Sequence, residues 1–170
     1  HTRSSTVCGL GDVYKRQFYH TEETILGLLE FSPKARIIDL GCGDGALTVK
    51  FASKLGSNEI YGIDHDAKKV VEANKRGVYA VVYDLNKPLP FRDGTFNVAL
   101  ANQVIEHLYD LDNFVSEIYR VLKLGGYTII ATENLASWHN VFALAFGKQA
   151  YSQHISKRRR IGSMLSLIHI

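Results

Sequence analysis

The sequence has few cysteines and lacks a long apolar run. Only Cys8 and Cys42 occur among the 170 residues, too few for the disulfide framework of a small secreted domain. No apolar stretch approaches the roughly 20 residues that a transmembrane helix requires, and the N-terminal residues show no secretory signal. We therefore expect a cytoplasmic protein without a membrane span.

The sequence also lacks a strong excess of charge of one sign. Lys and Arg total 20 and Asp and Glu total 17, which gives a net charge of +3. This excess is too slight to indicate binding to nucleic acid, and we expect neither a nucleic-acid partner nor a metal site. A length of 170 residues with 46% hydrophobic residues suits one globular domain with a sizeable core.

The two ends of the chain are related to each other through their codons. Asp12–Gln17 can be encoded by a nucleotide sequence whose reverse complement encodes Leu165–Ile170. This relation resembles the translated end of a transposon used to prepare DNA libraries. We interpret residues 1–17 and 165–170 as flanking artefact and residues 18–164 as one domain, the alternative being a coincidence in a genuine tail.

The stretch Arg36–Leu47 reads as a buried strand, a glycine turn and the start of a helix. Gly41, Gly43 and Gly45 alternate, so the backbone can turn sharply and approach a ligand without a Cβ in the way. The amide groups at the start of the following helix point into that turn. Asp39 adds a carboxylate near the end of an apolar strand, which is costly to bury unless it is hydrogen-bonded or paired.

Strand and helix patterns alternate along the rest of the chain. This alternation predicts an α/β fold with a doubly wound, mainly parallel sheet. The expected strands are Arg36–Leu40, Glu59–Asp64, Val78–Tyr83, Phe96–Ala101 and Tyr127–Thr132. The expected helices are Thr21–Glu30, Ala46–Leu55 with Gly56 as its stop, Ala67–Arg76 capped by Asp66, and Asp112–Leu122 ended by Gly125-Gly126.

Four polar side chains lie at or just after predicted strand ends, namely Asp39, Asp64, Asp84 and Asn102. Ligands of such sheets bind beyond the carboxyl ends of the strands, so these residues predict one binding rim. Asp64 follows the turn by about twenty residues, where an acid accepts hydrogen bonds from ribose hydroxyls; the alternative is a helix-capping role. Asp84 is either an acceptor for the amine of adenine or part of an Asx turn.

These motifs, in this order and spacing, resemble class I S-adenosylmethionine-dependent methyltransferases, in particular the group called methyltransferase type 11. The resemblance covers roughly Ile25–Thr132 and implies a Rossmann-like methyltransferase fold. The motifs that carry it are Asp39-Leu40-Gly41-Cys42-Gly43-Asp44-Gly45, Gly62-Ile63-Asp64, Asp84-Leu85, Asn102–Leu108 and Arg120–Gly126.

The resemblance implies the cofactor S-adenosyl-L-methionine and methyl transfer to O, N or C of a small-molecule acceptor. It places Asp39 and the Gly41–Gly45 turn at the amino-acid part of the cofactor, Asp64 at the ribose, and Asp84 and Leu85 beside the adenine. Asn102 and Gln103 would close the pocket near the methionine. The full set of implied cofactor residues is Asp39, Gly41, Cys42, Gly43, Asp44, Gly45, Asp64, His65, Asp84, Leu85, Asn102 and Gln103.

His107 is the candidate general base, needed only if the acceptor must lose a proton. The alternative is a histidine packed under its loop, and Glu106 either takes part in catalysis or fixes that loop. The sequence departs from the family at Asn97, where Asp is usual, and at Leu124, where Pro is usual. Neither position faces the cofactor in the family.

The family sheet normally continues with a further helix and an antiparallel strand pair, for which too little chain follows Thr132. We therefore expect a fragment truncated after the fifth strand. Residues 133–164 include an amphipathic pattern around Trp138 and Phe142, which is either a lid over the acceptor pocket or ordinary core. The basic segment Lys157–Arg160 either binds an acidic acceptor or a phosphate, or is a solvent-exposed stretch of charge without a ligand.

Two other functions stay open at this point. A nicotinamide-dependent oxidoreductase would also have a glycine turn, but its glycines follow G-x-G-x-x-G, whereas this chain has G-x-G-x-G after Asp39. A non-catalytic module that binds S-adenosylmethionine would keep the same rim.

Overall fold

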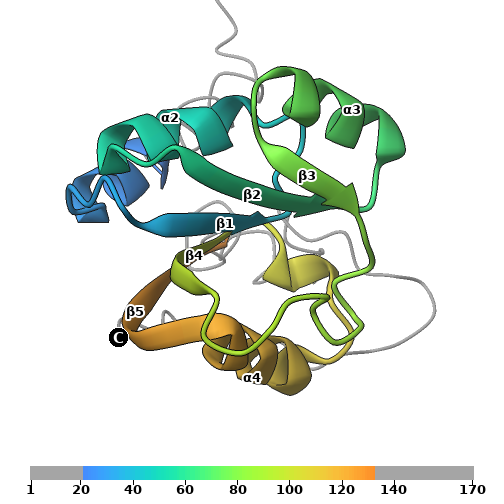
Figure 1. Ribbon diagram of the computed structural model, residues 1–170. Coiled ribbons are helices and arrows are strands. Elements are labelled where there is room, and N and C mark those ends of the chain that lie inside the picture. The colour runs from blue at the N-terminus through green and yellow to red at the C-terminus, as the bar shows by residue number, and fades with distance from the viewer. Residues whose placement is uncertain (1–20, 133–170) are drawn as a thin grey trace, which may run out of the picture.

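The computed structural model describes residues 21–132, and its centre is a sheet of five parallel strands (Figure 1). The order across the sheet is β3-β2-β1-β4-β5, so the direction of winding reverses between β1 and β4. The predicted doubly wound parallel sheet is therefore confirmed for these residues. The strands are β1 (Arg36–Leu40), β2 (Glu59–Asp64), β3 (Tyr79–Val82), β4 (Phe96–Asn102) and β5 (Leu122–Ala131).

Helices cover both faces of the sheet, and Figure 1 shows α2 and α3 on one side and α4 on the other. The alternation of side chains along β1 divides the core. Ile37 packs with Phe51 and Leu55 of α2, whereas Ile38 packs with Ile118 of α4. The helices are α2 (Ala46–Leu55), α3 (Ala67–Lys75), α4 (Leu111–Val121), the short 3-10 helix η1 (Ile105–His107) and a helical segment at residues 21–28.

The predicted helix ends at Gly56 and Asp66 are confirmed. Gly56 adopts a left-handed φ of 77° and its N–H returns to the last turn of α2, the usual way to satisfy carbonyls at a helix end. The Asp66 side chain accepts from the N–H of Lys68 at 2.9 Å, so it caps α3. Local hydrogen bonds thus determine where α2 ends and where α3 begins.

The prediction that Gly125-Gly126 ends the last helix is wrong. Helix α4 ends at Val121, and β5 begins at the next residue. Phe96 pairs with Leu122 and Val98 with Tyr127, so β5 has extra residues here and forms a bulge against β4. Gly125 has a φ of 79°, which explains why glycine lies in the bulge.

The connection from β3 to β4 is a loop that is fastened to α4. The Arg120 guanidinium donates to the carbonyl oxygens of Leu89 and Phe91 at 3.0 and 2.8 Å. The Glu117 carboxylate accepts from Arg120 at 2.7 Å and from the Leu89 N–H at 2.6 Å. The hydrogen bond from Arg120 lowers the pKa of Glu117, so the pair stays ionised and holds the loop on α4.

The predicted flanks 1–17 and 165–170 lie outside the described residues. The same holds for the predicted lid within 133–164 and for Lys157–Arg160. Within residues 21–132 no helix has the length and apolar character that a membrane crossing needs.

Gly62→Ala is expected to destabilise the fold by about 1–3 kcal/mol, because the core there has no room for a methyl group. A Cβ at Gly62 would lie 2.7 Å from Cys42 Sγ and 3.1 Å from Val78 Cγ1. Urea unfolding followed by circular dichroism measures the change. Gly27→Ala is the matched control, since a Cβ at this helical glycine meets nothing within 4 Å. Equal effects of the two substitutions would contradict this account of the packing.

Candidate functional site

The three glycines of the turn after β1 have different tasks. All have positive φ, at 90°, 56° and 78° for Gly41, Gly43 and Gly45, a region that other residues enter only with strain. A Cβ at Gly41 would lie 2.4 Å from Val104 Cγ2, and one at Gly45 would lie 3.0 Å from Ala73. A Cβ at Gly43 would meet nothing within 4 Å. Gly41 and Gly45 are therefore needed for packing, whereas Gly43 faces the open space where a ligand can approach.

The Asp64 carboxylate fixes the shape of this turn. Its Oδ2 accepts from the N–H of Gly43 at 2.8 Å, and its Oδ1 accepts from the N–H of Asp66 at 2.9 Å. Asp64 is 6% exposed, and these hydrogen bonds compensate its burial. The sequence predicted that Gly43 and Asp64 lie on the same rim, but it did not reveal the hydrogen bond between them.

Asp39 is a buried carboxylate on the α2 side of the sheet. It is 4% exposed and accepts a hydrogen bond from Thr48 Oγ1 at 2.5 Å. Burial raises the pKa of Asp39 to about 6, an effect that Thr48 opposes and the nearby Asp64 charge reinforces. Thr48 was not among the predicted site residues. The available signal was a hydroxyl on the otherwise apolar buried face of α2.

The Cys42 and Asp44 side chains support the turn from outside the ligand space. Cys42 packs in the core with Ala73 and Val78, and burial raises the pKa of its thiol to about 12. Asp44 accepts from the N–H of Ala46 at 3.1 Å and pairs with Arg76 at 3.2 Å. The Cys42 Sγ also donates to the carbonyl oxygen of Gly43 at 3.7 Å, so this side chain supports the turn from the core. Asp44 joins the start of α2 to the end of α3.

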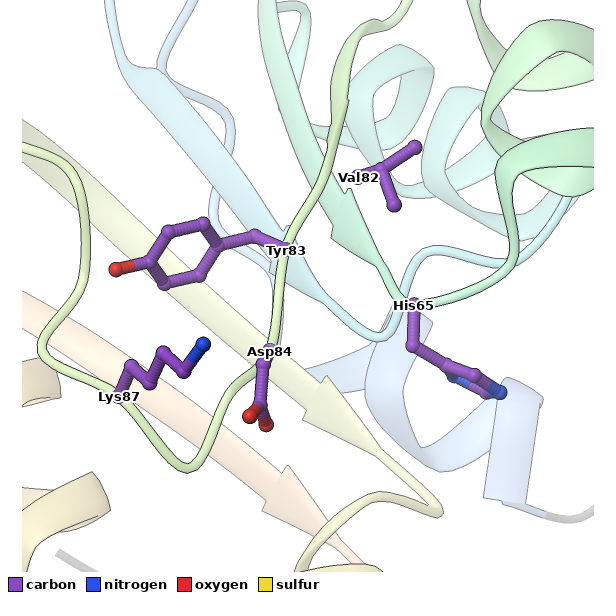
Figure 2. Close-up of a pocket in the computed structure, with 5 residues that line it drawn as sticks. All are labelled: His65, Val82, Tyr83, Asp84 and Lys87. Atoms are coloured by element: carbon purple, nitrogen blue, oxygen red, sulfur yellow. The ribbon is translucent and has the colours of Figure 1, made fainter.

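A cavity of about 360 Å³ lies beside the ends of β2 and β3 (Figure 2). Its lining residues are His65, Val82, Tyr83, Asp84 and Lys87. His65 is the residue after Asp64, and its side chain is 88% exposed. The cavity thus brings together His65 and Asp84, which the sequence assigned to the same cofactor.

Asp84 forms the Asx turn that was one of its two predicted roles. Its Oδ1 accepts from the backbone N–H and the Nδ2 of Asn86, both at 3.0 Å. These bonds lower the pKa of Asp84, so the carboxylate is ionised at neutral pH. Leu85 packs against the apolar cluster beneath α4. The turn leaves Oδ2 of Asp84 without a hydrogen-bond partner among the described residues, so the two predicted roles are compatible.

Asn102 and Gln103 end β4 next to the winding reversal. Asn102 Oδ1 is buried and has no hydrogen-bond partner among residues 21–132, which is costly unless a ligand or water supplies a donor. Gln103 has a φ of 56° and is the one non-glycine residue with positive φ in the described range 21–132. Its N–H donates to the Ala131 carbonyl oxygen at 2.8 Å. Strain and an unpaired acceptor at one strand end are typical of a binding site.

His107 lies at the end of η1 and is exposed. The neighbouring Glu106 accepts from Thr132 Oγ1 at 3.0 Å, which ties η1 to the end of β5. This contact favours the loop-fixing role for Glu106.

The two departures from the family lie away from this rim. Asn97 Oδ1 accepts from the N–H of Arg36 at 3.0 Å and from Lys123 Nζ at 3.2 Å, at the amino end of the sheet. Leu124 lies in the bulge of β5 and is fully exposed. Among the described residues, the Asn97 side chain bonds only to Arg36 and Lys123 and not to a predicted site residue.

The rim is acidic, with Asp39, Asp64 and Asp84 along three neighbouring strand ends. Carboxylates in this arrangement favour a ligand with positive charge. Within the described part of the chain, no group of three or more His, Cys, Asp or Glu side chains is placed to hold a metal ion.

A family described as "Methyltransferase domain" matches residues 38–130. The chain belongs to this family. The matched range contains every predicted cofactor residue, and it confirms the resemblance to class I S-adenosylmethionine-dependent methyltransferases. The rim of this methyltransferase domain therefore lies within the residues that match the family.

Curated relatives of the methyltransferase domain carry corresponding names. A protein of Mycolicibacterium smegmatis, named a probable S-adenosylmethionine-dependent methyltransferase, is 30% identical over 135 residues, covering 78% of this chain and 51% of its own length. The ubiquinone biosynthesis O-methyltransferase of Pelagibacter ubique is 32% identical over 113 residues, covering 64% and 46%. The chain thus spans about half the length of these relatives.

A solved structure supports the fold. Geranyl diphosphate C-methyltransferase from Streptomyces coelicolor, in complex with S-adenosyl-L-homocysteine, aligns with a TM-score of 0.62 and 22% identity. The alignment covers 79% of this chain and 56% of that one. The methyltransferase domain therefore has the Rossmann-like fold that the sequence predicted.

Asp39 is expected to make stability fall as the pH rises through about 6. Its pKa in the fold lies above the ordinary value of 3.8, so ionisation costs the folded state while the unfolded chain ionises freely. Asp39→Asn should therefore reduce the loss of unfolding free energy between about pH 4 and about pH 8, by about 2 kcal/mol. Urea unfolding at a series of pH values measures it.

The control for this pH series is Asp112→Asn, which removes an exposed carboxylate in the first turn of α4. Its pH profile should follow that of the wild-type protein. A profile of Asp39→Asn that also follows the wild type would show that Asp39 does not titrate as argued.

Proposed function

We propose that the whole protein transfers a methyl group from S-adenosylmethionine to an O, N or C atom of a small molecule. The observation that carries this proposal is the coincidence of the family match, residues 38–130, with the acidic strand-end rim. The names of relatives, among them an O-methyltransferase, support methyl transfer but leave the acceptor open.

The described residues fit this cofactor. Asn102 Oδ1 is a buried acceptor that receives no donor from the described part of the chain, and the ammonium group of the methionine part would supply one. Gly43 leaves open space beside the start of α2, where backbone N–H groups suit the carboxylate of the same part. The negative rim suits the positive charge of a sulfonium.

The ribose and adenine would lie further along the rim. Each oxygen of Asp64 accepts one backbone N–H and retains a lone pair for a ribose hydroxyl. The cavity beside His65 and Asp84 would take the adenine, with Leu85 at its apolar side. Asp39 would support the glycine turn that holds the cofactor and would not bind the cofactor directly, because its carboxylate already accepts a hydrogen bond from Thr48.

The bound cofactor supplies a methyl group that is already activated toward nucleophiles. The chain then has to position the acceptor in line with that methyl group and exclude water, and such positioning provides much of the acceleration. Where the acceptor loses a proton, we assign His107 as the base. Where it loses none, the exposed His107 has no chemical role.

Calorimetric titration with S-adenosylhomocysteine and with NAD tests the proposal. We expect S-adenosylhomocysteine to bind and NAD not to bind. Binding of NAD alone would favour the oxidoreductase alternative. Binding of S-adenosylhomocysteine by a protein that turns over none of a broad panel of acceptors would favour a non-catalytic module.

Asp64→Asn is expected to weaken S-adenosylhomocysteine binding by about tenfold or more, because an amide replaces the ionised acceptor of the ribose hydroxyls. The same calorimetric titration measures the dissociation constant. Asp112→Asn again serves as the control, and circular dichroism checks that both variants fold. An unchanged dissociation constant would remove the ribose role of Asp64.

His107→Ala is expected to lower kcat by about 10²–10⁴-fold for an acceptor that must lose a proton. The affinity for S-adenosylhomocysteine should stay the same, because His107 is assigned to the acceptor and not to the cofactor. Steady-state kinetics with such an acceptor measures kcat, and calorimetric titration measures the affinity for S-adenosylhomocysteine. A variant with wild-type kcat would exclude His107 as the base.

A further inference from the structure

Asn86 joins two loops that carry different parts of the candidate site. Its backbone N–H and its Nδ2 both donate to Asp84 Oδ1 at 3.0 Å. Its own Oδ1 accepts from the backbone N–H of Tyr109 at 2.9 Å. Tyr109 follows η1, the segment that ends at His107. One side chain therefore connects the adenine side of the site with the segment that bears the candidate base.

The hydrogen bonds from Asn86 occupy only one carboxylate oxygen of Asp84, so the other oxygen can accept from a ligand. Oδ1 takes both donors of Asn86, while Oδ2 accepts from no described residue. A carboxylate held through one oxygen has a restricted rotation, which places the other oxygen in a defined direction. Asp84 lines the cavity together with His65 and Lys87, as Figure 2 shows. A ligand in this cavity would therefore meet an acceptor of fixed orientation.

The rest of the loop is fixed by other residues, so the task of Asn86 is local. The Tyr83 hydroxyl donates to the Pro88 carbonyl oxygen at 2.7 Å and closes the loop on itself. Arg120 and Glu117 hold the loop at Leu89. Removing the Asn86 side chain would delete the Nδ2 bond to Asp84 and the bond from Tyr109, while the backbone N–H of residue 86 still donates to Asp84. The loop would stay attached to α4.

We propose that Asn86 is a positioning residue that makes the cavity selective for adenine and links the adenine side to the loop after His107. It holds Asp84 so that Oδ2 accepts from the exocyclic amine of adenine. This inference rests on the proposed function, because it takes S-adenosylmethionine as the ligand. Hypoxanthine has a carbonyl oxygen in place of that amine, and two acceptors would then face each other.

The test compares binding of S-adenosylhomocysteine and S-inosylhomocysteine by calorimetry. The wild-type protein should prefer the adenine compound by about tenfold or more, the value of one hydrogen bond to a charged group. Asn86→Ala should reduce this preference, because only the backbone N–H of residue 86 then holds Asp84 Oδ1, and Asp84→Asn should remove most of it. Asn58→Ala is the matched control, an exposed asparagine at the amino end of β2 that makes no side-chain hydrogen bond among the described residues.

Asn86→Asp separates the two contacts of the side chain. An aspartate oxygen still accepts from the Tyr109 N–H, but it donates nothing to Asp84 and repels it. We expect this variant to lose the preference for adenine while hydrogen exchange of the Tyr109 amide stays as slow as in the wild type. In Asn86→Ala the same amide should exchange about tenfold faster.

The outcomes distinguish this inference from the proposed function. Equal losses of affinity for both compounds in Asn86→Ala would indicate a merely structural role and overturn the inference, as would an unchanged ratio. The Tyr109 amide exchanging equally in wild type and Asn86→Ala would overturn the link between the loops. Absence of S-adenosylhomocysteine binding by the wild-type protein would overturn the proposed function and, with it, this inference.

Discussion

The hydrogen bond between the Asp64 carboxylate and the Gly43 N–H is the contact on which the site depends. It joins the end of β2 to the turn after β1, and so fixes the spacing between two strand ends that a ligand must span. The charge is tolerated in a buried place because backbone N–H groups surround it. The same carboxylate keeps two lone pairs for a ligand, so one residue both builds the turn and presents an acceptor.

The fold was predictable because its signals are local. The bounds of β1, α2 and β2 agree with the sequence patterns residue for residue, since apolar runs and left-handed glycines leave little choice of conformation. The bulge at Gly125-Gly126 was not predictable in this way. A glycine pair after a helix fits a helix stop equally well, and only pairing with β4 decides between the two.

The position of the candidate residues at one edge of the sheet was predictable, but the contacts between them were not. Parallel strands bring their carboxyl ends together, so Asp39, Asp64, Asp84 and Asn102 had to lie on one rim. The partners Thr48 and Asn86 are set by tertiary distances that spacing along the chain does not encode. Cys42 belongs to the motif in sequence, yet its side chain packs in the core, because neighbouring side chains in a tight turn point in different directions.

The Asn97 contact has a consequence for how this family can vary. The group that Asn97 uses is a side-chain oxygen, which accepts from the backbone N–H of Arg36 and from Lys123. Aspartate, the residue usual at this position, carries an oxygen of the same reach. The two residues can therefore exchange during evolution while β1 and β4 stay in register, and the position constrains shape more strongly than charge. A search that demands the acid here would pass over true members of the family.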